Sequence, residues 1–131
     1  MFDARALETL SRPIIARITT VGADGYPHTV PIWFMRDGDD LIAFTERSTV
    51  KVKNARQNPK GAFSVGGDPY GSPSYTIDGE FRIEDDPDHK LTARITRHYE
   101  SQQQADEWLE AWKNDDFVIL RLKPRRVIKV S

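Results

Sequence analysis

Two Asp-Gly turns near the start of the chain restrict its fold more than any other feature of the sequence. The first turn, at residues 22–25, separates a β-rich segment at 14–21 from a second one at 26–36. The second turn, at 37–40, leads into an apolar run at 41–45. Asp-Gly between β-rich segments is typical of tight hairpins. We therefore expect a meander of three antiparallel strands in this part of the chain.

Two prolines, Pro27 and Pro31, lie within the second of these segments. Each lacks the N–H donor that a strand ladder requires, which predicts an edge strand or a bulge. Protection of a sheet edge is the commoner explanation. The same irregularity would also leave backbone groups free for a ligand.

The rest of the chain adds helices and further strands. The expected helices lie at 3–10, from Ser48 to about 57, after an Asp86 cap with Pro87 at the first position, and at 101–113. The expected strands lie at 60–66, 74–84, 117–122 and 126–130. We expect a bulge at Gly79 and a break at Pro124. Short turns join most strands, which favours a mainly β protein: one domain, residues 1–131, with an antiparallel six- to seven-stranded barrel and flanking helices.

The helix that follows the apolar run is strongly basic. Its stretch, residues 47–60, contains five cations and no acid, although the formal net charge of the chain is only -1. Ser48 is a favourable N-cap, and the free N–H groups at a helix start attract anions. This geometry suits a phosphate. A solvated basic helix explains the same charges, so both interpretations stay open.

The composition excludes several classes of function. The near-neutral net charge argues against general affinity for nucleic acids. The chain has no cysteine, which excludes disulfides, thiolate catalysis and cysteine zinc sites. No apolar run approaches membrane-spanning length, and the first ten residues lack a signal core. We expect a cytoplasmic protein that does not bind membranes.

No catalytic motif is present. The chain lacks Gly-x-Gly-x-x-Gly, a P-loop and Gly-x-Ser-x-Gly. His28, His89 and His98 lack the spacing of metal ligands, so we expect neither a metal site nor a catalytic side chain. His28 either lines a pocket or is a plain surface histidine.

The aromatic residues allow a binding role or a core role. Trp33 and Phe34 are neighbours on an expected strand, so one belongs to the core and the other faces solvent, a partner or a ligand. Tyr70 and Tyr75 flank a loop rich in Gly and Pro, and they either contact a ligand or are a loop residue and a core residue. Trp108 lies one helical turn from Trp112, a spacing that is more often a core face than a site.

Several pieces of sequence, in order, carry a resemblance to a known family. They are residues 18–21 and 24–28, residues 31–34 and 37–39, and the pattern Lys51-x-x-Asn54-x-x-x-x-Pro59. From about residue 6 onward the chain resembles the flavin-binding split-barrel superfamily of pyridoxamine-phosphate-oxidase-like proteins. The short chain and the Lys51 pattern are most similar to the branch that uses the deazaflavin coenzyme F-420. Users of FMN share much of the pattern.

The resemblance implies a split β-barrel homodimer with two cofactor sites at its interface. In the family, the strand that matches 31–34 runs beside the flavin-type ring, and the segment that matches 45–51 holds the phosphate. The implied cofactor contacts are Pro31, Ile32, Trp33, Phe34, Thr45, Arg47, Ser48, Lys51, Lys53 and Asn54. Candidate contacts to substrate or to the opposite subunit are His28, Tyr70, Tyr75, Trp108 and Arg126.

The function expected from the resemblance is hydride transfer between F-420 and a small organic substrate. In such enzymes the cofactor supplies the chemistry, which agrees with the lack of a catalytic motif. The C-terminal motif of the pyridoxamine phosphate oxidases is missing, and only Arg125 and Arg126 remain there. The alternatives are an FMN-dependent oxidase-like enzyme and a non-catalytic protein that binds flavin or haem.

Overall fold

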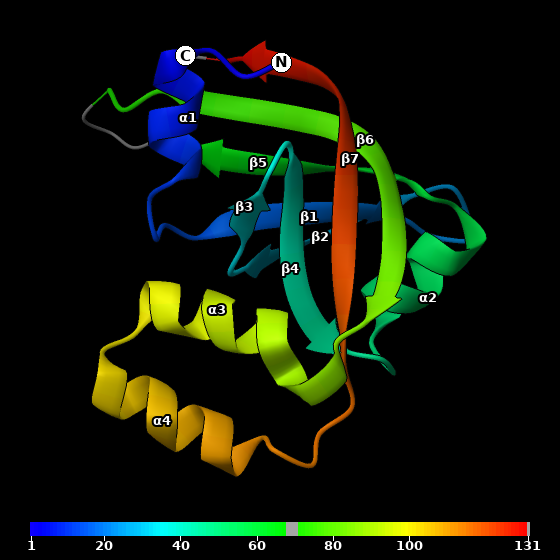
Figure 1. Ribbon diagram of the computed structural model, residues 1–131. Helices are drawn as coiled ribbons and strands as arrows, with labels where there is room; N and C mark the ends of the chain where they lie inside the picture. The colour runs from blue at the N-terminus through cyan, green and yellow to red at the C-terminus, as the bar shows by residue number, and fades with distance from the viewer. Residues whose placement is uncertain (68–70, 131) are drawn as a thin grey trace.

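A computed structural model describes residues 1–67 and 71–130, which form one folded-over antiparallel sheet with helices at its margins (Figure 1). The strand order is β2-β1-β5-β6-β7-β4-β3. The strands are β1 Ala16–Val21, β2 Pro27–Ile32, β3 Met35–Asp37, β4 Asp40–Glu46, β5 Lys60–Gly66, β6 Ser74–Asp85 and β7 Phe117–Lys129. The helices are α1 Ala4–Leu10, α2 Val50–Gln57, α3 Lys90–Tyr99 and α4 Gln102–Ala111, with a 3-10 turn at Pro87–His89. The predicted mainly β split barrel is confirmed, and its sheet stays open between β2 and β3.

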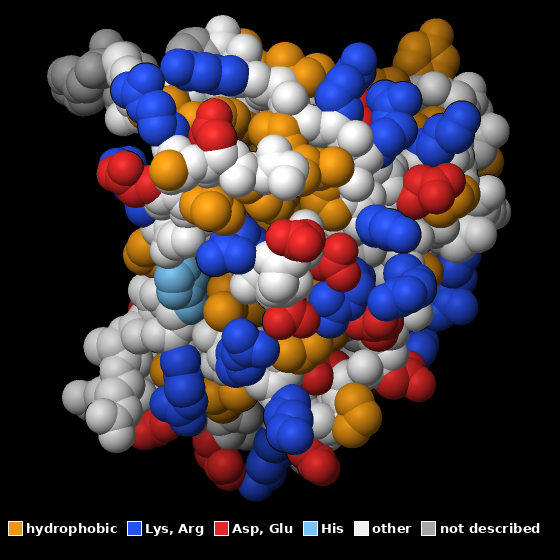
Figure 2. Space-filling view, turned by 45° about the horizontal axis from the view of Figure 1, so that its top comes forward, with side chains coloured by type: hydrophobic (Ala, Val, Ile, Leu, Met, Phe, Trp, Pro, Cys, Tyr) orange, Lys and Arg blue, Asp and Glu red, His pale blue; other side chains and the backbone are white. Residues whose placement is uncertain are grey.

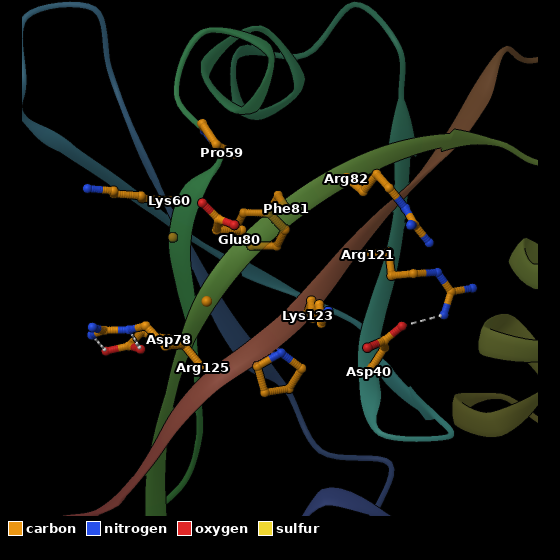
Figure 3. A pocket seen from close by; sticks show the side chains of 13 residues that line it. Asp40, Pro59, Lys60, Asp78, Glu80, Phe81, Arg82, Arg121, Lys123 and Arg125 are labelled. Atoms are coloured by element: carbon orange, nitrogen blue, oxygen red, sulfur yellow. Dashed lines mark hydrogen bonds and ion pairs between the residues drawn. The ribbon is translucent and has the colours of Figure 1, made fainter. Parts of the chain in front are cut away.

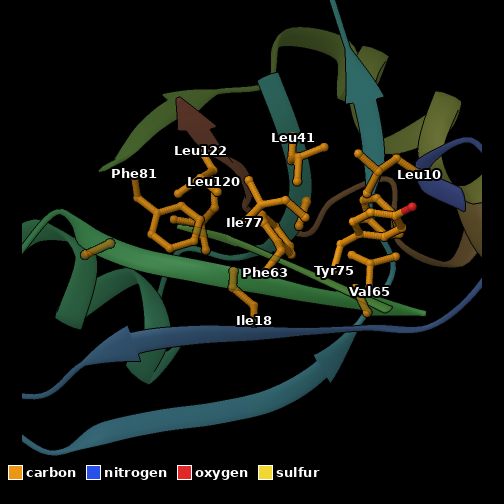
Figure 4. Close-up of a cluster of buried hydrophobic side chains, with 14 of the residues drawn as sticks. Leu10, Ile18, Leu41, Phe63, Val65, Tyr75, Ile77, Phe81, Leu120 and Leu122 are labelled. Carbon is orange, nitrogen blue, oxygen red and sulfur yellow. The ribbon is translucent and has the colours of Figure 1, made fainter. Parts of the chain in front are cut away.

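The main core lies inside the folded sheet (Figure 4). Inward and outward residues alternate along the strands, so that Ile18 of β1 is fully buried whereas Arg17 is exposed. The ring of Phe63 contacts those of Phe34 and Phe81, at centroid distances of 5.9 and 5.8 Å. Burial of each such side chain stabilises the fold by about 1.5–3 kcal/mol.

A second apolar cluster fixes the α3–α4 hairpin, which is inserted between β6 and β7. Ile95 of α3 is fully buried against Ile42 of β4 and Ile119 of β7. The two strands are neighbours, so the helix covers the outer face of this half of the sheet. No helix within residues 1–67 and 71–130 combines the length and hydrophobicity needed to cross a bilayer.

The expected single strand at 26–36 is in fact two strands at opposite edges of the sheet. β2 pairs only with β1, and β3 pairs only with β4. The predicted three-strand meander is therefore wrong, because the chain crosses from one edge to the other at Trp33 and Phe34. The edge position expected from Pro27 and Pro31 is confirmed.

The expected break at Pro124 is also wrong. β7 continues through it to Lys129, because Pro124 lies opposite Gly79 at a shift in the β6–β7 register. The shift falls between Asp78 and Gly79, so the predicted bulge is confirmed. At a bulge the ladder is interrupted, and a proline without an N–H is tolerated.

The helix starts agree only in part with the expected caps. α2 begins one residue later than expected, because the N–H and the hydroxyl of Thr49 both bind the Glu46 carbonyl (3.2 and 3.0 Å). Thr49, not Ser48, therefore precedes the helix. Asp86 does cap α3, since its carboxylate accepts the N–H groups of Leu91 and Thr92 at 2.9 and 2.8 Å. Pro87 begins the 3-10 turn before α3.

We expect Gly79→Ala to destabilise the protein by about 3 kcal/mol, the upper range for overpacking. A Cβ at this position would lie 2.0 Å from the Lys123 carbonyl oxygen, where only backbone movement relieves the clash. Urea denaturation measures the effect. Gly22→Ala is the matched control, because its Cβ would meet the movable Asp24 carboxylate at 2.9 Å. Equal midpoints for the two variants would contradict the prediction.

Candidate functional site

The connection between β4 and α2 presents a helix start without a side-chain cap. The Thr49 hydroxyl binds the Glu46 carbonyl and lies 3.2 Å from the Thr45 hydroxyl, so it does not reach the first turn of α2. Thr45 is buried, and Ser48 is exposed beside the helix start. The first peptide N–H groups of a helix carry a partial positive charge. The junction therefore favours an anion.

Lys51 lies in the first turn of α2 and is half-buried. Burial lowers the pKa of its ammonium group below the ordinary value. Among the described residues no carboxylate lies within ion-pair distance of it. A partly desolvated cation beside an uncapped helix start is a favourable place for a phosphate group.

Arg47 has a different environment from Lys51. Its guanidinium binds Asp116 at 2.8 and 3.1 Å and Asp85 at 2.8 Å. These bonds raise the pKa of Arg47 above its ordinary value, and Arg47 lowers the pKa of the Asp116 carboxyl. The side chain borders depressions of about 420 and 680 Å³ whose charged lining is mainly acidic. Two carboxylates thus neutralise the charge that the sequence assigned to a phosphate.

The segment 31–34 leaves the sheet edge and contacts both apolar clusters: Ile32 and Phe34 pack in the main core, and Trp33 packs in the second cluster. Pro31 is exposed, Ile32 and Trp33 are half-buried, and Phe34 is fully buried in the core. Phe34 is therefore the core member of the aromatic pair, and its side chain is not available to a ligand. Trp33 stacks on Tyr99 with ring centroids 5.0 Å apart and packs edge-on against Phe44 at 6.4 Å.

The hydroxyl of Tyr99 holds this segment from the end of α3. It accepts the Phe34 N–H at 3.0 Å and donates to the Ile14 carbonyl at 2.7 Å, with the Phe34 carbonyl at 3.1 Å. Burial raises the pKa of Tyr99 to about 12, so the hydroxyl keeps its proton at neutral pH. The role of Tyr99 was not predicted, because a tyrosine at a helix end carries no local signal of such a contact.

Three polar side chains meet where α2 covers β1. Asn54 is buried and donates to the Thr20 hydroxyl at 3.1 Å, which gives it a structural role. His28 lies opposite Thr20 in the β1–β2 ladder, and its Nδ1 is buried without a hydrogen-bond partner among the described residues. Lys53 is exposed on another side of the helix.

The remaining candidate contacts are dispersed over the chain. Tyr75 is 3% exposed and belongs to the main core, so its side chain cannot reach a ligand and the core interpretation is correct. Tyr70 lies outside the described residues. Trp108 stacks on Trp112 at 5.2 Å on α4, and Arg126 binds Asp78 at 3.1 Å on the sheet. The structure does not bring Tyr75, Trp108 or Arg126 together with Lys51.

A cavity of about 760 Å³ lies over the β6–β7 bulge (Figure 3). Its charges alternate from strand to strand, because Lys60 lies opposite Glu80 and Glu80 lies opposite Lys123. Nearby, Arg125 binds Asp78 at 3.0 and 3.1 Å. Three of its lining cations, Arg82, Arg121 and Arg125, bind acids, whereas Lys60 and Lys123 form no ion pair among the described residues, so the cavity is only partly compensated.

Charges of both signs are mixed on the face shown in Figure 2, with hydrophobic side chains exposed between them.

One half-buried residue, Arg121, binds three acids beside the cavity, Asp37, Asp40 and Glu84, at 2.9, 3.2 and 2.7 Å. Each acid lies at least 37 positions from Arg121 in the sequence, so their association was not predicted.

Comparisons with known proteins agree with the fold. The pattern of the family described as pyridoxamine 5'-phosphate oxidase matches residues 2–131. A solved F-420 reductase is 26% identical, with a TM-score of 0.75 over 92% of this chain and 94% of that chain.

Two more distant structures share the fold. General stress protein 26 from Bacillus anthracis is 17% identical, with a TM-score of 0.73 over 96% of this chain and 91% of that chain. The haem storage protein from Vibrio cholerae is 16% identical, with a TM-score of 0.70 over 94% of this chain and 90% of that chain. A search of curated proteins gives no match.

We expect the stability of the protein to fall in alkali through Tyr99. In the unfolded chain a tyrosine titrates near pH 10, whereas folding raises the pKa of Tyr99 to about 12. The unfolded state therefore loses this proton first, so the stabilisation is complete below about pH 10 and declines as the pH rises toward 12. Urea denaturation at several pH values measures the slope. Tyr99→Phe should show a shallower decline, and identical slopes would contradict the assignment.

Proposed function

Because the chain belongs to the pyridoxamine 5'-phosphate oxidase family, we propose that it is an oxidoreductase that binds the deazaflavin coenzyme F-420 and transfers hydride to or from a small organic substrate. The 26% identity to an F-420 reductase across nearly the whole chain supports this choice of cofactor. The observation that carries the proposal is Lys51, a half-buried cation without a carboxylate partner in the described chain, at an uncapped helix start.

The phosphate end of the cofactor is proposed to lie at the start of α2. Lys51 supplies charge, Ser48 supplies an exposed hydroxyl, and the first peptide N–H groups supply donors. Thr45 acts indirectly, because its hydroxyl lies against Thr49 and shapes the junction. Arg47 contributes less than Lys51, because binding a phosphate would require it to leave Asp85 and Asp116.

The ring is proposed to lie along segment 31–34. Pro31 lacks an N–H and is exposed, and Ile32 and Trp33 offer partly exposed apolar surface. Trp33 is held on both sides by Tyr99 and Phe44, so the surface that it presents is rigid.

The bound cofactor would supply the hydride chemistry, while the protein binds and orients it. Lys51 and the start of α2 would hold the phosphate end of the cofactor, and Trp33 would support its ring. Apolar walls from Ile32 and Trp33 exclude water from the ring, which strengthens polar contacts at the site. No side chain of this chain is required to form a covalent bond.

A homodimer is proposed to complete the site. The outward face of β2, β1 and β5 is largely uncharged, with Thr29, Thr19 and Ala62 side by side in register and Pro31, Arg17 and Ser64 in the next row. Cross-strand neighbours point to the same side of a sheet. This face adjoins segment 31–34, so a partner seated on it would lie beside the proposed ring position.

A haem-binding protein without turnover is the second candidate function. It is favoured by the buried Nδ1 of His28, which has no hydrogen-bond partner in the described part of the chain. A haem storage protein has the same fold. The purified protein distinguishes the possibilities by its absorption spectrum. Flavin bands would indicate FMN, a Soret band would indicate haem, and a colourless protein that quenches the fluorescence of added F-420 would support the proposal.

We expect Lys51→Ala to weaken F-420 binding by roughly tenfold to a hundredfold, because a charge-assisted bond is worth about 1.5–3 kcal/mol. Fluorescence titration measures the Kd. Arg56→Ala is the matched control: it removes the same charge from the same helix at an exposed position, and it should bind within about twofold of the parent by the weak worth of exposed charges. Equal losses in both variants would show only a general charge effect.

We expect the parent protein to sediment as a dimer and Thr19→Lys to shift it toward monomer. Thr19 lies at the centre of the outward face, where its hydroxyl binds that of Thr29 at 2.9 Å. An unpaired lysine buried between two subunits loses its hydration without compensation. Gln103→Lys on exposed α4 is the control. A parent that remains monomeric at micromolar concentration would refute the dimer.

A further inference from the structure

The Tyr99 hydroxyl occupies the place of a missing bond in the β1–β2 ladder. The ladder pairs Ala16 with Ile32, and in the same register Ile14 would face Phe34. Instead, the Phe34 N–H donates to the Tyr99 oxygen at 3.0 Å, and the Tyr99 O–H donates to the Ile14 carbonyl at 2.7 Å. A hydroxyl is both donor and acceptor, so it extends the ladder by one inserted atom.

This insertion separates the two strands at the point where the chain leaves β2. The backbone between β2 and β3 belongs to no strand, yet Phe34 is fully buried. Buried peptide groups require partners, and Tyr99 serves the N–H of Phe34 directly while lying 3.1 Å from its carbonyl. The position of residues 33 and 34 is therefore set by a side chain of α3, not by the sheet.

The Tyr99 ring fixes the side chain of the same segment. Its plane lies 9° from that of Trp33 at a centroid distance of 5.0 Å. Phe44 meets the indole edge-on at 66° from another strand, so Trp33 is constrained in two directions. Backbone and indole of one short segment thus depend on one residue that lies 65 positions along the chain from Phe34.

We infer that Tyr99 is a positioning residue for the cofactor, because it fixes the backbone of Phe34 and the indole of Trp33 on which the ring of the proposed cofactor lies. This inference rests on the proposed function. Tyr99 does not itself touch the reacting atoms. Its hydroxyl sets the direction in which the chain leaves β2, and its ring sets the tilt of the indole.

The test separates positioning from simple stability. Tyr99→Phe keeps the ring stack and removes only the hydroxyl, and Tyr26→Phe, at a side chain 74% exposed, is the matched control. Ile77→Val shortens a fully buried side chain of β6, so it lowers stability while it leaves the hydrogen bonds and the ring stack of Tyr99 in place. Two measurements are made well below the unfolding temperature: amide hydrogen exchange at Phe34 in cofactor-free protein, and the Kd for F-420.

We expect Tyr99→Phe to speed exchange at Phe34 and to raise the Kd about five- to tenfold, in line with the loss of a buried hydrogen bond. Tyr26→Phe and Ile77→Val should leave both values unchanged. Faster exchange with an unchanged Kd would overturn the positioning role and leave the proposed function intact. A parent that binds F-420 neither in titration nor in its spectrum would overturn both.

Discussion

A peptide group that leaves the sheet must find its hydrogen bonds elsewhere, and this requirement at Phe34 governs the architecture of the whole chain. The protein needs only two residues, Trp33 and Phe34, to pass from one edge of the sheet to the other. Tyr99 stabilises this short crossing, because its hydroxyl supplies a donor and an acceptor in one group. Without the crossing, β3 and β4 would continue the β1–β2 hairpin, and the main core would lose the side chains of Leu41 and Ala43 that β4 provides.

The sequence predicts the local features of this fold well, and it predicts poorly the features that depend on contacts between distant segments. The Asp-Gly turns, the edge prolines and the bulge at Gly79 are all decided by backbone chemistry within a few residues, and all are present. The crossing at 33–34 depends on a tyrosine from α3, and the tolerance of Pro124 depends on the strand opposite it. A pattern of apolar residues along one segment carries no information about such distant partners. For this reason one strand was expected where β2 and β3 occur, and two strands were expected where β7 occurs.

The same limit applies to the candidate site. The basic stretch around α2 is visible in the sequence, and Lys51 lies in the first turn of the helix, as the resemblance implies. The sequence does not distinguish Lys51 from Arg47, because the acids that neutralise Arg47 come from the ends of β6 and the loop before β7. In the described structure Arg47 is thus compensated by two carboxylates, whereas Lys51 has none within ion-pair distance.

The long pairing of β6 with β7 has a consequence for how the chain folds. Asp85 pairs with Val118 near the α3–α4 hairpin, whereas Tyr75 pairs with Lys129 at the far end. Pairing Tyr75 with Lys129 first would close a longer loop than pairing Asp85 with Val118, and a longer loop loses more chain entropy. Pairing that starts beside α3 and α4 and proceeds along the strands therefore loses less entropy at the first step. Such distant contacts slow folding relative to a helical domain of equal size. We therefore expect β6 and β7 to pair first beside the α3–α4 insertion and last at the end where Tyr75 faces Lys129.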